Sequence, residues 1–319
     1  MGQSFRVSRH DDGRRIDKII RKMWPDLPLS ALMRAFRKGM VRVDGQRSEC
    51  SVRVTEGQTV ELPWDDEVVK HAPGPNLQAA RTGANIEIIY ADRDICIVNK
   101  PSNLLAQPDT SGGESVISRV ASTLEWKDAS FSPTPAHRLD RNTSGALALA
   151  LSGTALRSLH EAWRLGKVKK TYLAIVAGNT PKEGEINSPL LKKGEDNIVV
   201  VDRAIGQTAL TRYRKLEGDG SVSLLLVELM TGRPHQARVH LASVGFPLVG
   251  DLKYGNRRIN EEWKAMNVNR PLLHSRCLDF QSLGSPLAHL SGKKFLAVPP
   301  ADFLEVLSGR GWRLYDRGV

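Results

Sequence analysis

Short apolar runs of the length typical of β-strands dominate the chain from residue 86 onward. They lie at residues 87–90, 95–98, 146–151, 172–177, 209–214, 223–229 and 272–280. One helical stripe interrupts them, because Leu156, Leu159 and Trp163 share a face of a segment that follows Gly153 and ends at Gly166. So few helices between strands argue against a doubly wound parallel sheet. We predict an α+β fold with a mixed, largely antiparallel central sheet.

The first 64 residues have a different pattern, in which two short helices precede a small sheet. Apolar residues recur at helical spacing twice, first at Ile16, Ile19, Ile20 and Met23 and then at Leu29, Leu32, Met33 and Phe36. Gly39 is expected to end the second helix. Strands are predicted at 41–43, 52–54 and 60–62, the first of them running into an Asp44-Gly45 turn.

Positive charge is concentrated in this N-terminal segment. The whole chain has 46 Lys and Arg against 35 Asp and Glu, a net charge of +11, and residues 1–60 hold 13 basic against 7 acidic side chains. Arg34, Arg37 and Lys38 lie along the basic side and end of the second predicted helix. Such a concentration is typical of a module that binds a polyanion. A solvated basic face that aids solubility is the alternative.

Length and composition limit the cellular setting. A chain of 319 residues is long enough for about two domains of roughly 150 residues each. No run approaches the roughly 18 consecutive apolar residues of a membrane span, and the first residues lack the apolar core of a signal peptide. Cys50, Cys96 and Cys277 form neither a disulfide framework nor a metal pattern. We expect a cytoplasmic protein without a membrane partner.

Residues 137–145 (HRLDRNTSG) place one carboxylate, Asp140, between Arg138 and Arg141. Neighbouring cations favour the ionised form of a carboxyl group. An ionised carboxylate suits a nucleophile or an electrostatic stabiliser better than a proton donor. For this motif taken alone, a structural aspartate paired with an arginine at the end of a loop is the alternative.

A second polar segment, residues 231–245 (TGRPHQARVHLASVG), predicts a helix with Pro234 in its first turn and a glycine at its end. Arg238 falls toward the apolar side of that helix. A buried arginine is costly unless a carboxylate pairs with it. We predict that Asp140 is this partner, and Asp251 is the structural alternative.

Residues 169–174 (KKTYLA) place Tyr172 at the start of a predicted strand, close to two lysines. An aromatic ring in such a position can stack on a base while an ammonium group, here that of Lys170, binds phosphate. A tyrosine in a strand is more often a core residue, so this segment alone is a weak signal.

The segment from RRIDKIIRKMWPDLPLSALMRAFRKGMVRVDGQR to EGQTVELP resembles the S4 domain, an RNA-binding module. The shared features are an R-x-D start, a basic second helix, a G-x-V-x-V-[DN]-G hairpin and a late G-x-x-V strand. The resemblance covers residues 10–64 and implies that Arg34, Arg37 and Lys38 contact RNA. A helical cap that only packs on the rest of the protein is the alternative. Residues 65–85 read as a linker, and residues 86–319 as a second, catalytic domain.

Five further segments occur in the order and spacing of the RluA-type pseudouridine synthases, which the chain resembles over nearly its whole length. They are VNKPSNLLAQP, HRLDRNTSG, KKTYLA, GRPHQARVHLASVGFPLVGDLKYG and LLHSRCLDF. Together with the S4-like front end, they are most similar to the RluC-like type, which acts on large-subunit ribosomal RNA. The resemblance implies the pseudouridine synthase fold, RNA as the partner and a monomer. It also implies an isomerase that detaches uracil from ribose, turns it and rejoins it through carbon.

The resemblance implies a role for each matching residue. Asp140 matches the family's catalytic aspartate, and Arg238 matches the arginine that pairs with it. Tyr172 matches the tyrosine that stacks on the target uracil and assists proton removal. Arg138 matches an arginine expected to flip or hold RNA, and His137 is expected to shape this substrate-binding loop. Whether Asp140 attacks the uridine or draws a proton from its ribose stays open.

An isomerisation of this kind needs neither a nucleotide cofactor nor a metal, and we expect none. The chain has no GxxxxGK[ST] loop, no GxGxxG after a strand and no ligand-spaced Cys/His cluster. His235 and His240 are five residues apart, so they do not share a helical face as a metal pair would.

Other function classes stay open. A non-catalytic RNA-binding or ribosome-associated protein on the same fold is one, although intact Asp140, Tyr172 and Arg238 speak against it. A hydrolase that uses Asp140 with His137 or His160 is another, but no GxSxG signature appears. A glycosylase would release free uracil. The sequence does not reveal which uridine is modified.

Overall fold

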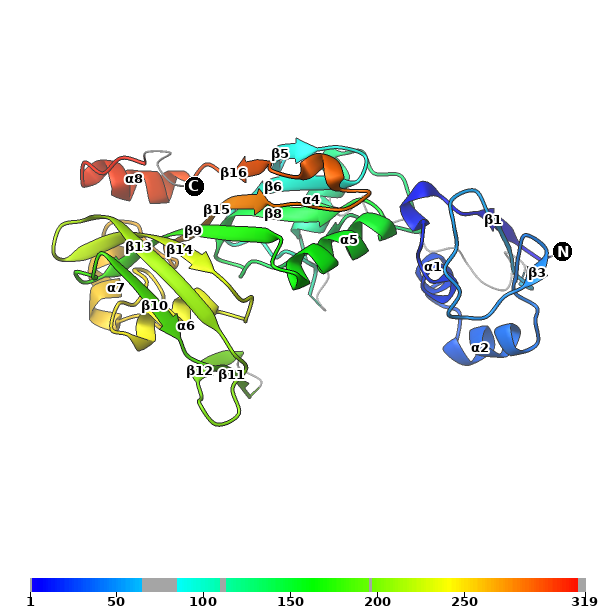
Figure 1. Ribbon diagram of the computed structural model, residues 1–319, viewed down its shortest axis with the longest axis horizontal. Coiled ribbons are helices and arrows are strands. Elements are labelled where there is room, and N and C mark those ends of the chain that lie inside the picture. The colour runs from blue at the N-terminus through cyan, green and yellow to red at the C-terminus, as the bar shows by residue number, and fades with distance from the viewer. Residues whose placement is uncertain (1, 65–84, 110–112, 195–196, 315–319) are drawn as a thin grey trace.

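The computed structural model describes residues 2–64, 85–109, 113–194 and 197–314. A small N-terminal module lies at one end of the molecule, and a large twisted sheet makes up the rest (Figure 1). The described helices are α1 (Ile16–Met23), α2 (Leu29–Arg37), α4 (Val116–Thr123), α5 (Gly153–Arg164), α6 (Gln236–Ser243), α7 (Arg257–Lys264) and α8 (Ala301–Gly309), with 3-10 turns η1 (Arg9–Asp11) and η2 (Ala288–Leu290). Apart from residue 85, the linker predicted at 65–85 lies outside the described residues.

The N-terminal module has a four-stranded sheet in the order β1-β4-β2-β3. Its strands are β1 (Ser4–Arg6), β2 (Arg42–Val43), β3 (Gln46–Arg47) and β4 (Thr59–Glu61). Helices α1 and α2 form at the two predicted stripes and share an apolar core with this sheet. Asp44 and Gly45 both have positive φ, which suits the two-residue β2–β3 turn. The strand predicted at 52–54 is wrong, because the backbone of Val52 and Val54 bonds to residues 13–16 ahead of α1.

The large domain is built on a ten-stranded sheet whose main order is β10-β13-β14-β9-β15-β8-β6-β5, with β16 beside β15 and β7 beside β8. The strands are β5 (Glu87–Ala91), β6 (Ile95–Lys100), β7 (Thr134–Pro135), β8 (Ser144–Ala150), β9 (Val168–Ala177), β10 (Glu183–Asn187), β13 (Leu210–Gly218), β14 (Val222–Leu229), β15 (Leu273–Phe280) and β16 (Lys294–Leu296). Of the strand pairs described in it, β15–β8 is parallel and the others are antiparallel. The predicted mixed, largely antiparallel α+β fold is confirmed.

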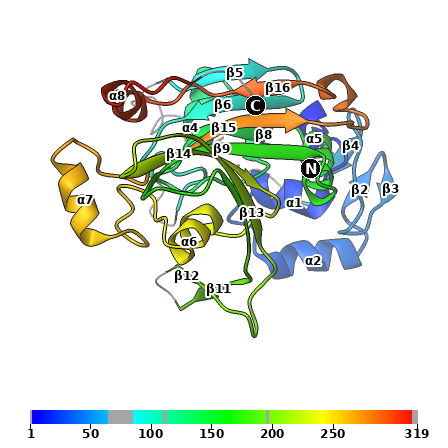
Figure 2. The same cartoon turned by 60° about the vertical axis from the view of Figure 1, so that its left-hand side comes forward.

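Helices cover both faces of this sheet (Figure 2). Along β8, Leu147 and Leu149 face a core that includes residues of α4, whereas the intervening alanines face α5. Along β9, Ala174 packs in the core with residues of α6, whereas Leu173 faces α7 and α8. The middle strands are therefore buried on both faces. The strands β11 (Leu190–Lys193) and β12 (Ile198–Val201) form a separate hairpin that projects from the large domain (Figure 1).

Gly145 fixes the point at which the HRLDRNTSG loop enters the sheet. Its φ of +113° lies in the region that favours glycine. A Cβ atom at this position would lie 2.2 Å from the backbone oxygen of Ser275. Ser275 pairs with Gly145 on one side and with Tyr172 on the other. The glycine therefore lets the loop that bears Asp140 end beside β15, one strand away from the strand that bears Tyr172.

Polar contacts attach the N-terminal module to the large domain next to α5. The Nδ1 atom of His10 donates to the backbone oxygen of Leu151 over 2.6 Å. Arg14 donates to the backbone oxygen of Ser130 over 2.7 Å. The hydroxyl of Thr154 donates to Asp12 over 2.8 Å. The module is thus held by several contacts outside the region of the predicted linker.

The buried histidine of β15 predicts a loss of stability in acid. His274 is fully buried between the Ser144 hydroxyl and the backbone oxygen of Ala297, and burial lowers its pKa to about 4. Its contribution to stability is present above the unfolded pKa of about 6.5 and is lost as pH falls toward 4. We expect it to account for a drop of about 3 kcal/mol in the free energy of unfolding across that range. Urea unfolding from pH 7 to pH 4 should show a shallower drop for His274→Gln; an equal drop would contradict this assignment.

Candidate active site

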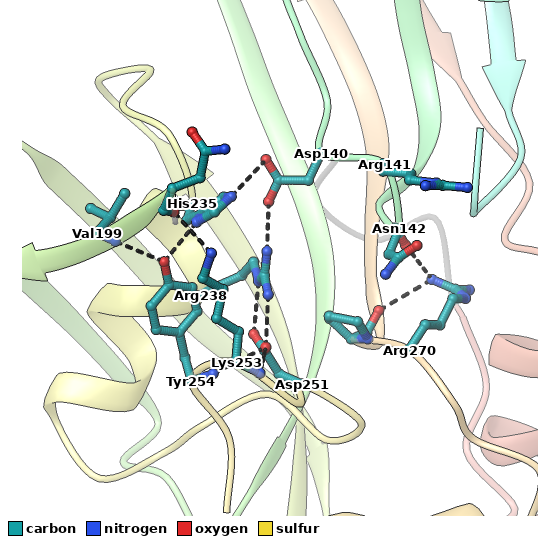
Figure 3. Close-up of polar contacts among 12 residues, drawn as sticks. Asp140, Arg141, Asn142, Val199, His235, Arg238, Asp251, Lys253, Tyr254 and Arg270 are labelled. Atoms are coloured by element: carbon teal, nitrogen blue, oxygen red, sulfur yellow. Dashed lines mark hydrogen bonds and ion pairs between the residues drawn. The ribbon is translucent and has the colours of Figure 1, made fainter. Parts of the chain in front are cut away.

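Asp140 lies in the loop between β7 and β8, and 28% of its side chain is exposed. Its Oδ2 atom accepts a hydrogen bond from Nη1 of Arg238 on α6 over 3.3 Å (Figure 3). Segments 98 residues apart in sequence thus meet at a carboxylate and a guanidinium group. The predicted contact between these two side chains is confirmed, and their catalytic roles stay predictions.

Arg238 is held more tightly by Asp251 than by Asp140. Its Nε and Nη2 atoms each donate to the Asp251 carboxylate over 2.8 Å, and only 1% of the Asp251 side chain is exposed. Burial opposes the charge of Arg238, but Asp251 and then Asp140 raise its pKa above the usual value. Asp140 and Asp251, the two alternative partners expected from the sequence, therefore both bind Arg238. Asp251 orients the guanidinium group, and the remaining Nη1 points at Asp140.

The helix that bears Arg238 begins later than predicted. It starts at Gln236, with His235 as its N-cap at φ +52°, so Pro234 lies before the helix and its placement in the first turn is wrong. The side chain of Gln236 explains the late start. Its Oε1 atom accepts from the backbone N–H of Arg233 and from the hydroxyl of Thr231, which fixes the loop ahead of the helix.

His235 and Tyr254 form a second arm of the site beside Arg238 (Figure 3). The Nδ1 atom of His235 lies 2.6 Å from the Tyr254 hydroxyl, and that hydroxyl accepts from the backbone N–H of Val199 over 2.9 Å. The guanidinium of Arg238 lies 5.0 Å from the centre of the Tyr254 ring, within cation–π range. The Nε2 atom of His235 is 4.0 Å from Oδ1 of Asp140.

Two cationic side chains hold the backbone directly after Asp140. Lys100, at the end of β6, is fully buried and donates to the backbone oxygens of Arg141, Leu104 and Pro101 over 2.8 to 2.9 Å. Arg270 donates to the backbone oxygen of Asn142 over 3.3 Å. The pKa of Lys100 is lowered to about 7, because the effect of burial exceeds the opposing effect of the Asp140 charge. The three acceptors of Lys100 match the three N–H groups of an ammonium.

Lys100→Met should therefore loosen the loop that bears Asp140. Methionine fills a similar volume but leaves three carbonyl groups, that of Leu104 buried and the other two partly buried, without their donor. We expect the free energy of unfolding to fall by about 3 kcal/mol and turnover to fall at least tenfold. Denaturant unfolding and single-turnover kinetics measure the two effects. Lys127→Met, at an exposed position, is the matched control. Equal losses of stability and turnover in the two variants would show that Lys100 does not hold the Asp140 loop in place.

Tyr172 lies in the middle of β9 rather than at a strand start, because the strand begins at Val168; the predicted placement was wrong. Only 5% of the residue is exposed, and it belongs to the core between the sheet and α6. Burial raises the pKa of its phenol above the usual range, and the charge of Asp140 raises it further. The phenol is thus protonated at neutral pH. Stacking on uracil stays a prediction for a ring that is largely covered.

The two lysines before Tyr172 have different surroundings. Lys170 is half-buried, its charge acts on His137, and burial lowers its pKa. Lys169 instead lines a separate hollow of about 680 Å³ together with Thr171 and Arg212. Of the two, Lys170 is therefore the one placed near the Asp140 loop.

His137 is engaged with the protein rather than with Asp140. Its Nε2 atom accepts from the backbone N–H of Ala148 over 3.1 Å, and its ring stacks on Trp163. Burial lowers the pKa of His137 to about 3, with a further lowering from Lys170. The other histidine considered for a hydrolase, His160, is exposed on α5. Neither His137 nor His160 therefore forms the contact with Asp140 that a hydrolase of this kind would need.

The remaining predicted substrate-binding residues are exposed and lie at two places. Arg138 is exposed on the loop of Asp140. Arg34, Arg37 and Lys38 are exposed on and after α2, in the N-terminal module and away from the loop of Asp140 (Figure 1). The structure thus joins Asp140 and Arg238 in one cluster, with Tyr172 buried near it, and leaves the basic helix as a separate surface.

Sequence reasoning assigned no role to four members of the cluster: His235, Tyr254, Lys100 and Arg270. The first three lie inside the segments that carry the family resemblance. The contact between His235 and Tyr254 depends on the left-handed conformation of His235, which no periodicity reveals. A lysine that directly follows an apolar strand and precedes a proline was the available signal for Lys100.

Two general properties concern the described part of the chain. Its residues contain no group of three or more His, Cys, Asp or Glu side chains arranged to hold a metal ion. None of its helices combines the length and apolar character needed to cross a membrane.

Comparison with known proteins assigns the family. The sequence model of the RNA pseudouridylate synthase family matches residues 94–243, which include Asp140, Tyr172 and Arg238. Ribosomal large subunit pseudouridine synthase C of Vibrio cholerae is 33% identical over 273 residues, covering 84% of this chain and 85% of the relative. The Escherichia coli K12 protein of the same name is 32% identical over 287 residues, covering 88% of each chain. The chain belongs to the RNA pseudouridylate synthase family.

Solved structures agree on the fold. Human RNA pseudouridylate synthase domain containing 4 superposes with a TM-score of 0.59 at 22% identity, over 75% of this chain and 97% of that one. Human RNA pseudouridylate synthase domain containing 1 gives 0.53 at 24% identity, over 73% of this chain and 99% of that one. At these identities the likeness concerns the fold alone.

Proposed function

We propose that this protein is an RNA pseudouridine synthase that isomerises uridines in large-subunit ribosomal RNA through Asp140. The observation that supports it most is the state of the Asp140 carboxylate. One oxygen is bound by Arg238, the other has no hydrogen-bond partner among the described residues, and the side chain is partly exposed. An oriented carboxylate with one available oxygen is suited to act as a nucleophile or a base on a nucleotide turned out of its stack.

The proposed reaction has two possible first steps. In one, Oδ1 of Asp140 attacks C1′ and the N1–C1′ bond breaks, so that uracil leaves with the electron pair. In the other, Oδ1 takes the proton from C2′ while the same bond breaks. The uracil anion then turns, and its C5 atom bonds to C1′. In the first route the C1′–Oδ1 bond breaks as the new bond forms, and in the second route C2′ takes back the proton that Oδ1 removed. C5 finally loses its proton while N1 gains one. No electrons are gained or lost overall, so no cofactor is needed.

Tyr172 and Arg238 have supporting parts in this scheme. Arg238 keeps the Asp140 carboxylate in one orientation. A protonated Tyr172 can donate a hydrogen bond to the detached uracil. Removal of the C5 proton by Tyr172 requires the phenol to pass its own proton on first, because burial holds it in the protonated form.

Residues 10–64 are proposed to act as an S4-like RNA-binding domain, joined by residues 65–85 to a catalytic domain at 86–319. Arg34, Arg37 and Lys38 would bind phosphates at a distance from Asp140. Nearer the reaction, Arg138 and Lys170 would hold the RNA, and His137 would shape that loop. We also propose that the protein works as a monomer in the cytoplasm.

The triple variant Arg34→Ala, Arg37→Ala and Lys38→Ala should weaken RNA binding without changing turnover of bound RNA. Each lost phosphate contact should lower the slope of log K against log salt by about 1. Filter binding at several salt concentrations measures the slope. The matched control replaces Arg257, Arg258 and Lys264 on α7 with alanine. Equal slopes in the two triple variants would show that α2 is not part of the RNA interface.

Position-resolved mapping of pseudouridine tests the substrate. Ribosomal RNA from cells with and without the gene is compared, and the missing sites are restored with a plasmid copy. We expect one or a few large-subunit uridines to lose the modification without the gene. Loss of pseudouridine only from small-subunit or transfer RNA would contradict the proposed substrate but would still support the proposed isomerisation.

A further inference from the structure

The hydrogen-bond pattern around His235 favours the tautomer in which Nε2 carries the ring hydrogen. The backbone N–H of Val199 can only donate, so the Tyr254 oxygen accepts from it. Among the described residues, the acceptor available to the Tyr254 O–H is Nδ1 of His235, 2.6 Å away. With Nδ1 as the acceptor, the neutral ring carries its hydrogen on Nε2.

That Nε2–H has no protein acceptor at bonding distance within the described residues. Oδ1 of Asp140 lies 4.0 Å from Nε2, which is too long for a hydrogen bond. Arg238 already occupies the other oxygen of the same carboxylate. Figure 3 shows His235 and Arg238 each directed toward a different oxygen of Asp140. The donor on His235 and the available oxygen of Asp140 therefore border the same space.

The backbone of His235 has a conformation that is energetically unfavourable for a residue other than glycine. A non-glycine residue at φ +52° is uncommon, and such strain persists where surrounding contacts determine it. Here Tyr254 holds the ring, and 17% of the His235 side chain is still exposed.

We propose that His235 donates its Nε2–H to the 2′-hydroxyl oxygen of the nucleotide that reacts with Asp140, and so contributes to selection of RNA over DNA. The proposal rests on the proposed function. In either first step Oδ1 of Asp140 approaches C1′ or C2′. The 2′-oxygen is one bond from C2′ and two bonds from C1′, so it is near Oδ1 in both cases. The 2′-hydroxyl is also the group by which a protein distinguishes the two nucleic acids at a given site.

The test measures binding, so that it does not depend on turnover. The probes are a stem-loop RNA whose loop holds only uridines and the same stem-loop with 2′-deoxyuridines in the loop. The full chain with Asp140→Asn is the parent. We expect the parent to bind the all-ribose loop roughly five- to tenfold more tightly, the range of one hydrogen bond. Adding His235→Leu should reduce that ratio to below about twofold.

Further variants separate contact from structure. His235→Gln keeps an N–H at similar reach and should preserve most of the ratio. Tyr254→Phe lets the ring hydrogen move to Nδ1 and should lower the ratio. His160→Leu, at an exposed position, should leave it unchanged. A parent that does not discriminate, or a His235→Leu variant that discriminates as the parent does, would overturn the proposal. Release of tritium from C5-labelled uridine by the wild-type protein, measured in parallel, reports separately on the proposed function.

Discussion

Asp140→Asn is expected to abolish pseudouridine formation while leaving RNA affinity within about twofold of the wild type. Asparagine has nearly the same shape but is a much weaker nucleophile and base. Loss of a reacting group of this kind lowers turnover by about 10⁴-fold or more. Release of tritium from C5-labelled uridine in ribosomal RNA measures turnover, and filter binding measures affinity.

The matched control for this variant is Asp26→Asn, an exposed aspartate in the N-terminal module. It should release tritium at the wild-type rate. If Asp140→Asn retains more than a small percentage of the wild-type rate, Asp140 is not the reacting group. If it loses RNA affinity to the same extent as turnover, its role is in binding.

Arg238→Met is expected to have the largest effect on stability. It leaves Asp251, whose side chain is almost wholly buried, without its charged partner. Removing one member of a buried ion pair costs about 3–5 kcal/mol in the free energy of unfolding. Turnover should fall with it, because Asp140 loses the group that orients it. Urea unfolding and tritium release measure the two losses.

A second substitution separates these two losses. In Arg238→Met combined with Asp251→Asn, the amide oxygen can still accept from the backbone N–H groups of Lys253 and Tyr254, and the buried charge is gone. Stability should recover by most of the lost amount while turnover stays low. Recovery of both would mean that Arg238 acts only as a structural partner of Asp251.

The sequence was sufficient for the fold class and the central contact, because both rest on strong local signals. Apolar alternation along 146–151 and 272–280 marks strands that are buried and paired. The position of Arg238 near the apolar side of its helix required a carboxylate partner. Both features follow from periodicity and from the cost of burying a charge.

Other parts of the site could not be predicted because they depend on contacts between distant segments. The length of the β9 strand ahead of Tyr172 is set by pairing with β14 and β15, and its lysines alternate between environments. The start of α6 depends on the Gln236 side chain, which displaces the helix start from Pro234 to Gln236. Residues 52–54 have strand-like composition but pair with irregular backbone. Each case is a local preference overridden by tertiary structure.

Analysis of nucleosides from RNA treated with the purified protein tests the central claim most directly. If the Asp140–Arg238 pair serves an isomerase, chromatography of the digested RNA will show pseudouridine gained in the same amount as uridine lost, without free uracil. Free uracil with abasic sites in the RNA would instead show a glycosylase, and an unchanged nucleoside profile on ribosomal RNA would contradict catalysis altogether.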